Sequence, residues 1–227
     1  MNGHRDLGEL LKEALAEEYT IRQLDIGADA RLAKKGMVFR TESYAVEGLG
    51  HLCVLRMDAF LGLMKMETVV LAAETKDLPL VNLDWVRAFG KETQIAELYD
   101  TQLQPYPQAA LDAFQQIRDR DADLPDPPPS APRWYDAILY PCSYHKSGKG
   151  IGGRLAQAAA DYCKTFAGQL ETADPCDREA KHAKTRAFAE TLFANGGPAV
   201  DQVTKLFGPE VARRLVVGHM YGVQEEG

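Results

Sequence analysis

The chain has 227 residues, of which 45% are hydrophobic and 26% charged, as in ordinary globular proteins that bury a core. Its 33 acidic and 26 basic residues give a net charge of −7, the opposite sign to a general nucleic-acid binder. No run approaches 18 apolar residues, so neither a membrane-spanning helix nor a membrane partner is predicted. Four cysteines without C-x-x-C or zinc spacing predict reduced thiols in a cytoplasmic protein.

The first predicted element is an amphipathic helix over about 5–19, where leucines recur at helical spacing. Five short strand-like segments follow, and their short connectors favour antiparallel hairpins over helical crossovers. These segments are 37–48, 50–60, 64–74, 78–87 and 91–102. A helix is predicted over about 108–120. Residues 124–133 contain five of the twelve prolines, which indicates an extended connector.

A sixth short strand is predicted at 134–144, and the rest of the chain has helical patterns. The predicted helices are about 153–169, 177–194, 199–206 and 209–220. Pro198 and Pro209 are placed at helix starts, where the missing N–H costs nothing. Strands in the middle of the chain with helices before and after them predict an α+β fold. We expect one domain, a three-layer α/β/α sandwich with a central antiparallel sheet.

Ionisable side chains occur in this meander where a half-buried strand should be apolar. Glu67 directly precedes a strongly apolar run, and Asn82 and Asp84 alternate with apolar residues. If consecutive strands pair antiparallel, Glu67, Asp84 and Thr93 can converge on one side of the sheet. A carboxyl desolvated there would have a raised pKa and could donate a proton near pH 7. Both carboxyls could instead lie on a solvated face, and the pattern leaves this interpretation open.

The stretch D-L-P-L-V-N-L-D at 77–84 resembles the D-L-P-x-x-x-x-D of ferredoxin-dependent bilin reductases and the related red chlorophyll catabolite reductases. Three further motifs are similar to those of that family. The other motifs are W-Y-D-A-I-L-Y at 134–140, A-D-Y-C-K-T-F at 160–166 and L-F-G-P-E-V-A-R-R-L at 206–215. Each motif alone is weak, but all four occur in the family's order over about residues 37–222.

The resemblance implies an α/β/α sandwich that binds an open-chain tetrapyrrole between its sheet and its C-terminal helices. Electrons would arrive singly from reduced ferredoxin or flavodoxin, with no bound cofactor, flavin or metal. Side-chain carboxyls would then protonate the substrate radical. The net negative charge of the chain fits poorly with ferredoxin, which is itself acidic.

Residue by residue, the resemblance places Asp84 at the family's central catalytic aspartate. Glu67 lies 17 residues upstream, where the bilin reductases carry a histidine and the chlorophyll-catabolite branch a glutamate. Glu67 would be a second proton donor or would tune Asp84. Asn82 could hydrogen-bond pyrrole or lactam groups of the substrate.

Other substrate contacts follow from the same resemblance. Thr93 falls where a hydroxyl residue contacts a substrate propionate, and His145 and Lys146 lie near the family's basic propionate contact. Many members carry a second functional aspartate in an N-D element. Here that region reads N-G-G-P at 195–198, which leaves Asn195 as the candidate contact. Either the upstream glutamate takes over the missing role, or the reduction is restricted, or activity is lost.

Two alternatives remain open from the sequence. One is a non-catalytic tetrapyrrole-binding protein of the same fold, which the missing aspartate favours somewhat. The other is a hydrolase or transferase that uses Glu67 and Asp84 as an acid/base pair. The G-x-G-x-x-G stretch at 148–153 lacks the βαβ context of a dinucleotide site, so we interpret it as a loop.

Overall fold

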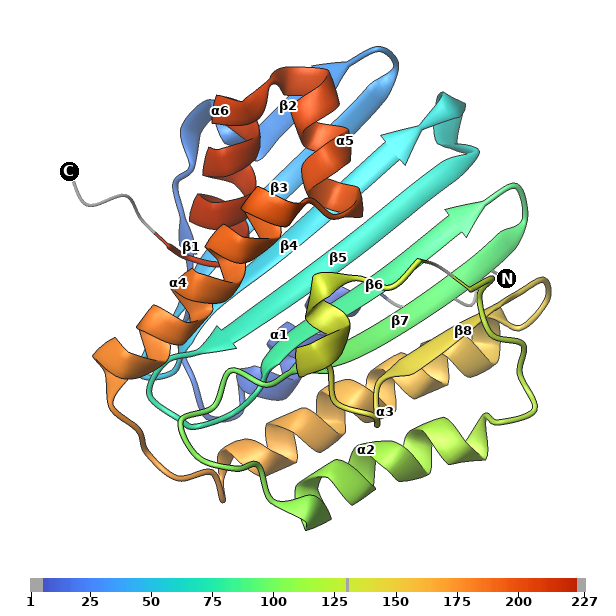
Figure 1. Ribbon diagram of the computed structural model, residues 1–227. Helices are drawn as coiled ribbons and strands as arrows, with labels where there is room; N and C mark the ends of the chain where they lie inside the picture. Colours follow the sequence, from blue (N-terminus) through green and yellow to red (C-terminus); the bar gives the residue numbers. More distant parts are fainter. Residues whose placement is uncertain (1–5, 130, 224–227) are drawn as a thin grey trace.

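The computed structural model, which describes residues 6–129 and 131–223, contains one central antiparallel β-sheet (Figure 1). The sheet has eight strands in the order β1-β3-β4-β5-β6-β7-β8, and β2 also pairs with β3. The strands are β1 (Ile21–Leu24), β2 (Arg31–Lys34), β3 (Met37–Val46), β4 (Gly50–Ala59), β5 (Met64–Ala73), β6 (Leu80–Ala88), β7 (Lys91–Tyr99) and β8 (Tyr144–Gly148). Consecutive strands from β3 to β7 are joined by short turns, as the spacing of the sequence predicts.

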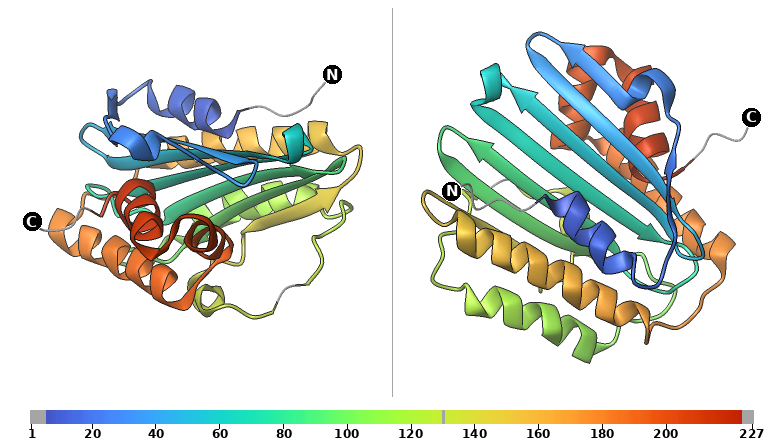
Figure 2. Two further views of the ribbon diagram at one scale, coloured as in Figure 1. Left: turned by 90° about the horizontal axis from the view of Figure 1, so that it is seen from above. Right: turned by 180° about the vertical axis from the view of Figure 1, so that it is seen from behind.

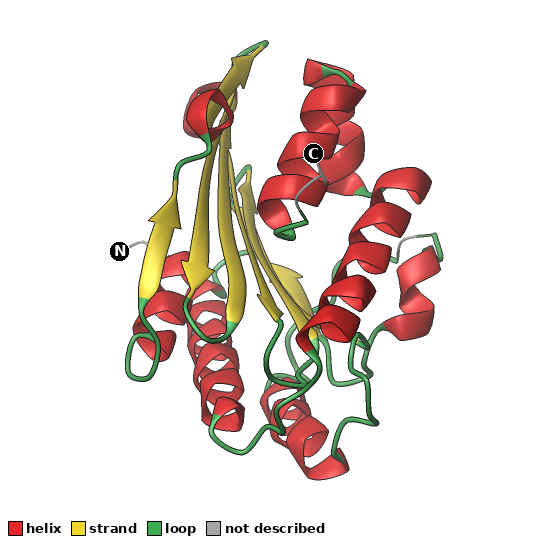
Figure 3. Cartoon of the chain, turned by 90° about the vertical axis from the view of Figure 1, so that its left-hand side faces the viewer, coloured by secondary structure: helices red, strands yellow, loops and turns green. Residues whose placement is uncertain are grey.

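Helices cover both faces of this sheet, which makes three layers (Figures 1 and 2). One face is covered by α1 (Leu7–Leu15), α2 (Gln108–Arg120) and α3 (Gly152–Leu170). The other is covered by α4 (Arg178–Asn195), α5 (Pro198–Phe207) and α6 (Pro209–Arg213), which continues into a π-helical segment (Arg214–Met220). Figure 3 shows the sheet edge-on between the two layers. The predicted α/β/α sandwich is confirmed. None of the described helices is long and apolar enough to cross a membrane.

Each face of the sheet has its own apolar core, because side chains alternate along every strand. Val69 of β5 points toward α1 and α3, where it joins Leu11 and Phe166. Its neighbour Val70 points the other way and joins the core that contains Leu215. From Val69 to Ala73, β5 is therefore apolar on both faces, and its sequence there is a continuous apolar run.

Local signals account for the helix starts. The Asp6 side chain accepts a hydrogen bond from the Glu9 amide at 3.0 Å, and Asp177 does the same for the Ala180 amide at 2.7 Å. Both are N-caps that satisfy backbone donors at a helix terminus. Pro209 lies in the first turn of α6, as predicted.

The predicted strand over 134–144 is wrong. Residues Trp134–Ile138 form a short 3₁₀ helix, and β8 begins only at Tyr144. The apolar residues there pack as a helical turn against the C-terminal layer, with the rings of Trp134 and Phe188 5.4 Å apart. β1 and β2 were not predicted, because they are four residues each and mostly exposed, so neither alternates clearly. Residue 5 of the predicted first helix lies outside the described residues.

Candidate ligand site

A cavity of about 240 Å³ lies between the sheet and the C-terminal helices. Its floor is formed by alternate residues of β5, β6 and β7, and its roof by α4, α5 and the π-helical segment. The floor residues are Met66, Thr68, Asn82, Asp84, Val86, Ile95, Glu97 and Tyr99. The roof and one side include Phe188, Leu192, Val200, Val216, Met220, Tyr221, Arg133 and Tyr135. A polar floor thus faces a largely apolar roof.

Asp84 lies in the centre of the floor and is held by its neighbours. Thr68 stands directly across from it in the β5–β6 register, and its hydroxyl donates a hydrogen bond to Oδ1 of Asp84. Asn82, two residues back on the same strand face, donates from Nδ2 to Oδ2 of Asp84 at 2.7 Å. Both carboxyl oxygens are therefore oriented by the sheet itself.

The pKa of Asp84 is raised from the ordinary value of 3.8 to about 6, mainly because the side chain is buried and in part because the Glu97 carboxylate lies nearby. The hydrogen bonds from Thr68 and Asn82 and the proximity of His145 oppose this shift in part. A carboxyl with such a pKa holds a proton in a sizeable fraction of molecules near neutral pH, so Asp84 can act as a general acid.

Glu97 is the second carboxyl of the cavity and was not among the predicted site residues. It pairs with Asn82 in the β6–β7 register, and Nδ2 of Asn82 lies 3.5 Å from its Oε2. The Tyr99 hydroxyl donates to the same oxygen at 2.5 Å, while Nε2 of His145 lies 3.0 Å from Oε1. Strand alternation places Glu97 on the same face as Thr93, so the signal was present in the sequence.

Thr93 and His145 lie on the same face of the sheet as Asp84, at its β7–β8 side. The Thr93 hydroxyl is 2.6 Å from the hydroxyl of Ser147. Neither Thr93 nor His145 lines the cavity itself. His145 reaches it indirectly through Glu97, and its side chain is 37% exposed, so it connects the cavity floor with solvent.

Glu67 lies on the opposite face of the sheet, so the predicted convergence with Asp84 is wrong. The register pairs Asp84 with Thr68 and Glu67 with Trp85. Because side chains alternate along a strand, Glu67, which is the residue before Thr68, points to the opposite face, the one that α1 covers. There its carboxylate accepts hydrogen bonds from the Leu7 amide at 2.9 Å and the Gly8 amide at 3.2 Å, and Glu67 is only 2% exposed.

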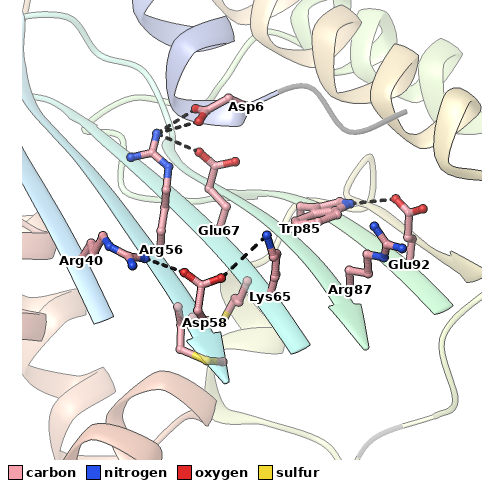
Figure 4. Close-up of a pocket in the computed structure, with 11 residues that line it drawn as sticks. Asp6, Arg40, Arg56, Asp58, Lys65, Glu67, Trp85, Arg87 and Glu92 are labelled. Atoms are coloured by element: carbon pink, nitrogen blue, oxygen red, sulfur yellow. Dashed lines mark hydrogen bonds and ion pairs between the residues drawn. The ribbon is translucent and has the colours of Figure 1, made fainter. Parts of the chain in front are cut away.

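The surroundings of Glu67 indicate a structural role (Figure 4). Arg56 lies 3.3 Å from Glu67 and 2.8 Å from Asp6, so one guanidinium joins both carboxylates. Burial alone would raise the pKa of Asp6, but its hydrogen bonds with Glu67 and Arg56 outweigh this and lower the pKa to about 2. A Cβ atom on Gly8 would lie 2.7 Å from Val54, so glycine permits this close contact of α1 with the sheet.

Two further predicted contacts are not in the cavity. Lys146 pairs with Gln94 in the register and so points to the face opposite Asp84. Its Nζ donates to the carbonyl of Leu124 at 2.9 Å and to Asp126 at 2.8 Å, which anchors the proline-rich connector. Asn195 is the last residue of α4, is exposed and does not line the cavity.

The residues that the sequence analysis missed come from unexpected segments. Arg133 and Tyr135 follow the proline-rich connector, which has no periodic pattern, and close one side of the cavity. The Arg133 guanidinium donates a hydrogen bond to the Tyr135 hydroxyl. Within residues 6–129 and 131–223, no group of three or more His, Cys, Asp or Glu side chains is arranged to hold a metal ion.

Comparison with known proteins gives a structural match but no sequence match. No protein-family model matches the chain, and neither does any curated protein. Among solved structures, the chain is similar to phytochromobilin synthase from tomato in complex with biliverdin. The TM-score is 0.74 at 14% identity, over 96% of this chain and 84% of that chain. This chain has the fold of that enzyme. The α/β/α architecture that the sequence motifs imply is confirmed by this likeness.

Proposed function

We propose that the protein binds an open-chain tetrapyrrole in the cavity between sheet and C-terminal helices and reduces it with electrons from a ferredoxin-like donor. The observation that carries the proposal is Asp84, a carboxyl whose pKa is raised to about 6 at the floor of that cavity. The shared fold with a protein crystallised with biliverdin and the sequence motifs support the same substrate class. Flavodoxin is an equivalent donor in this proposal.

The lining of the cavity suits a flat conjugated molecule with polar edges. The apolar roof side chains Phe188, Leu192 and Val216 would pack against the conjugated plane. Asn82 and the two carboxyls of the floor would meet the pyrrole and lactam groups. Arg133, which lines one side of the cavity, would pair with a propionate.

The cavity must widen for such a ligand, because 240 Å³ is below the roughly 300–1,000 Å³ of typical ligand pockets. The roof helix α5 is the element best placed to move. Gly196 and Gly208 flank it with φ of 80° and 92°, values that favour glycine, and such residues can absorb a backbone rotation. We therefore expect α5 to shift outward when the substrate binds.

In the proposed reaction, the donor supplies one electron to the conjugated substrate and Asp84 supplies one proton to the resulting radical anion. A second electron and a second proton complete the reduction of one double bond. The redox chemistry belongs to the substrate and the donor, while the protein selects the carbon that is protonated. Asp84 would regain its proton from solvent between the two steps. Asn82 donates hydrogen bonds to both Asp84 and Glu97 and so holds the two carboxyls next to each other on the cavity floor.

A second candidate function is tetrapyrrole binding without reduction. The region at 195–198 lacks the aspartate that the resembling family carries there, which favours this alternative. Glu97 weakens this argument for binding without reduction, because it gives the cavity a second carboxyl on the same floor as Asp84.

Spectroscopy separates these possibilities. Biliverdin is titrated into the purified protein, and reduced ferredoxin is then added without oxygen. The proposal predicts a saturable red shift followed by bleaching of the bound pigment. A red shift without bleaching would identify a binding protein, and no spectral change with any linear tetrapyrrole would contradict both functions.

Glu97→Gln should shift the pH dependence of reduction to lower pH. Glu97 raises the pKa of Asp84, so removing its charge lowers that pKa and leaves less protonated Asp84 above neutrality. We expect up to about tenfold less activity at pH 8 and little change at about pH 4, measured as the initial rate of bleaching. Glu47→Gln, at an exposed turn, is the matched control. An unchanged pH profile would show that Glu97 does not raise the pKa of Asp84.

A further inference from the structure

Four turns lie next to one another at one end of the sheet (Figure 1). Antiparallel pairing brings them there, because Val38 lies opposite Asp58, Met64 opposite Ala88, and Glu92 opposite Gly148. The turns are 35–36 between β2 and β3, 60–63 between β4 and β5, 89–90 between β6 and β7, and 149–150 after β8. We call this row of turns the turn edge.

The two central turns of the turn edge carry exposed apolar side chains. Phe60, Leu61, Leu63 and Phe89 are 59%, 105%, 59% and 70% exposed, and they are the large hydrophobic residues most exposed in the described part of the chain. A hydrogen bond from the Phe89 amide to the Leu63 carbonyl joins the two turns at 3.3 Å. Four large apolar groups thus protrude together into water, which is unusual unless they bind something.

The backbone of these turns is strained as well. In the described residues, the non-glycine positions with positive φ are Lys35, Phe60, Leu61 and Phe89, with φ between 50° and 56°. All four lie in the turn edge. Bulky side chains rarely adopt this left-handed conformation, and glycine would adopt it without cost. Selection for stability alone would not place Phe and Leu at such positions.

Cationic side chains flank the apolar turns on both sides. Within two residues of the turns, the cations outside the core are Lys34, Lys35, Lys65, Arg87, Lys91 and Lys149, and the carboxyls are Asp58 and Glu92. Asp58 pairs with Arg40 at 2.5 Å and lies 3.9 Å from Lys65. A protein with a net charge of −7 therefore concentrates positive charge at this end.

We propose that the turn edge docks on an anionic lipid surface. The apolar side chains of the two central turns insert below the headgroups, and the flanking lysines meet the lipid phosphates and carboxylates. This contact needs no membrane-spanning helix. Met66 and Val86, which line the ligand cavity, lie only two residues from Met64 and Ala88 at the turn edge, so the cavity would lie close to the lipid surface.

The shape of the turn edge favours a bilayer over an acidic protein as the partner. The apolar groups protrude from separate turns, and Leu61 is as exposed as an isolated residue. A rigid protein would need a matching pocket for each turn, whereas a fluid bilayer fits around any protrusion. Positive charge on both sides of the apolar centre also matches a uniformly anionic plane.

Vesicle sedimentation tests the proposal independently of tetrapyrrole binding. The full-length protein is mixed with vesicles of phosphatidylcholine alone or with roughly one-third phosphatidylserine. We expect the protein to sediment with the anionic vesicles only and to be released by high salt. Protein that stays in the supernatant with both vesicles would overturn the proposal and leave an acidic protein as the partner of the turn edge.

Variants distinguish a docking role from a structural one. Leu61→Gly relieves the left-handed strain, so its Tm should equal or exceed that of the wild type, while its partition onto anionic vesicles falls about tenfold. The double variant K34E/K35E should lose binding as well. R22E/K164E, which reverses two exposed cations away from the turn edge, is the matched control. Equal binding by Leu61→Gly, or equal loss in the control, would contradict the proposal.

Discussion

Asp84→Asn is expected to slow bilin reduction by at least about a hundredfold and to leave biliverdin binding within about threefold. The amide keeps the size of the side chain, and its oxygen can accept from Asn82 while its NH2 donates to the Thr68 hydroxyl, but it has no acidic proton to donate to the substrate radical. The rate of bleaching with reduced ferredoxin and the dissociation constant from the visible titration measure the two effects separately.

Asp112→Asn, an exposed substitution on α2, is the matched control and should change neither quantity. Bleaching by Asp84→Asn at the wild-type rate would remove Asp84 from the reaction. Parallel loss of binding and rate would instead make it a residue that only holds the ligand.

The same variant has a predictable effect on stability. The pKa of Asp84 is raised to about 6 in the folded protein, so the native state binds this proton more tightly than the unfolded chain does. Wild-type stability should therefore fall as pH rises from about 4 to about 6, and Asp84→Asn should lack this fall. The free energy of unfolding of Asp84→Asn relative to that of the wild type should therefore be higher at pH 8 than at pH 4, by on the order of 2 kcal/mol, as measured by urea unfolding.

Unlike Asp84→Asn, Glu67→Ala is expected to lower the free energy of unfolding strongly and to leave the rate of bilin reduction unchanged. The variant leaves the Leu7 and Gly8 amides without their acceptor and removes one carboxylate from the buried side of Arg56. Such losses cost about 3 kcal/mol in the free energy of unfolding. The rate of bleaching per folded molecule should equal that of the wild type.

Glu47→Ala is the control for this effect. Its side chain meets Arg22 at 3.4 Å on the surface, and an exposed pair of this kind contributes less than about 1 kcal/mol. A Glu67→Ala variant that unfolds like the wild type but bleaches biliverdin as slowly as Asp84→Asn would restore Glu67 to the catalytic role that the sequence suggested.

Asp84 and Glu67 show which features of the site can be predicted from the sequence and which cannot. The alternation of polar and apolar residues in each strand predicts which residues share a face, and it correctly joins Asn82 with Asp84. It does not predict the register between strands. The connection from β5 to β6 sets Thr68 opposite Asp84, and a shift of one residue would have placed Glu67 there instead.

Other parts of the fold differ in how strongly the sequence specifies them. The strands β3 to β7 are rich in Val, Leu, Thr, Met or Tyr, similar in length and separated by turn residues, so their existence and order could be predicted. The aromatic residues at 134–138 gave the same signal as a strand, because a 3₁₀ turn packed against α4 is equally apolar. Arg133 reaches the cavity only because of the path of the proline-rich connector, for which no local pattern exists.

The cavity also depends on contacts between distant segments. Its floor comes from residues at 66–99 and its roof from residues at 188–221, and the packing of Phe188 on Tyr99, with ring centroids 4.9 Å apart, joins the two. The roof helix α5 has an amphipathic pattern that predicts burial of one face, but the pattern does not specify how far from the sheet the helix lies.

The most direct test of the central claim is a visible-spectrum titration with biliverdin of the wild type, Leu192→Trp and Leu63→Trp. Leu192 lines the roof of the cavity, and tryptophan there fills the space, whereas Leu63 is exposed at a turn. The account predicts a saturable red shift with one equivalent for the wild type and for Leu63→Trp, and none for Leu192→Trp. An identical titration of all three proteins, or no shift in the wild type, would contradict it.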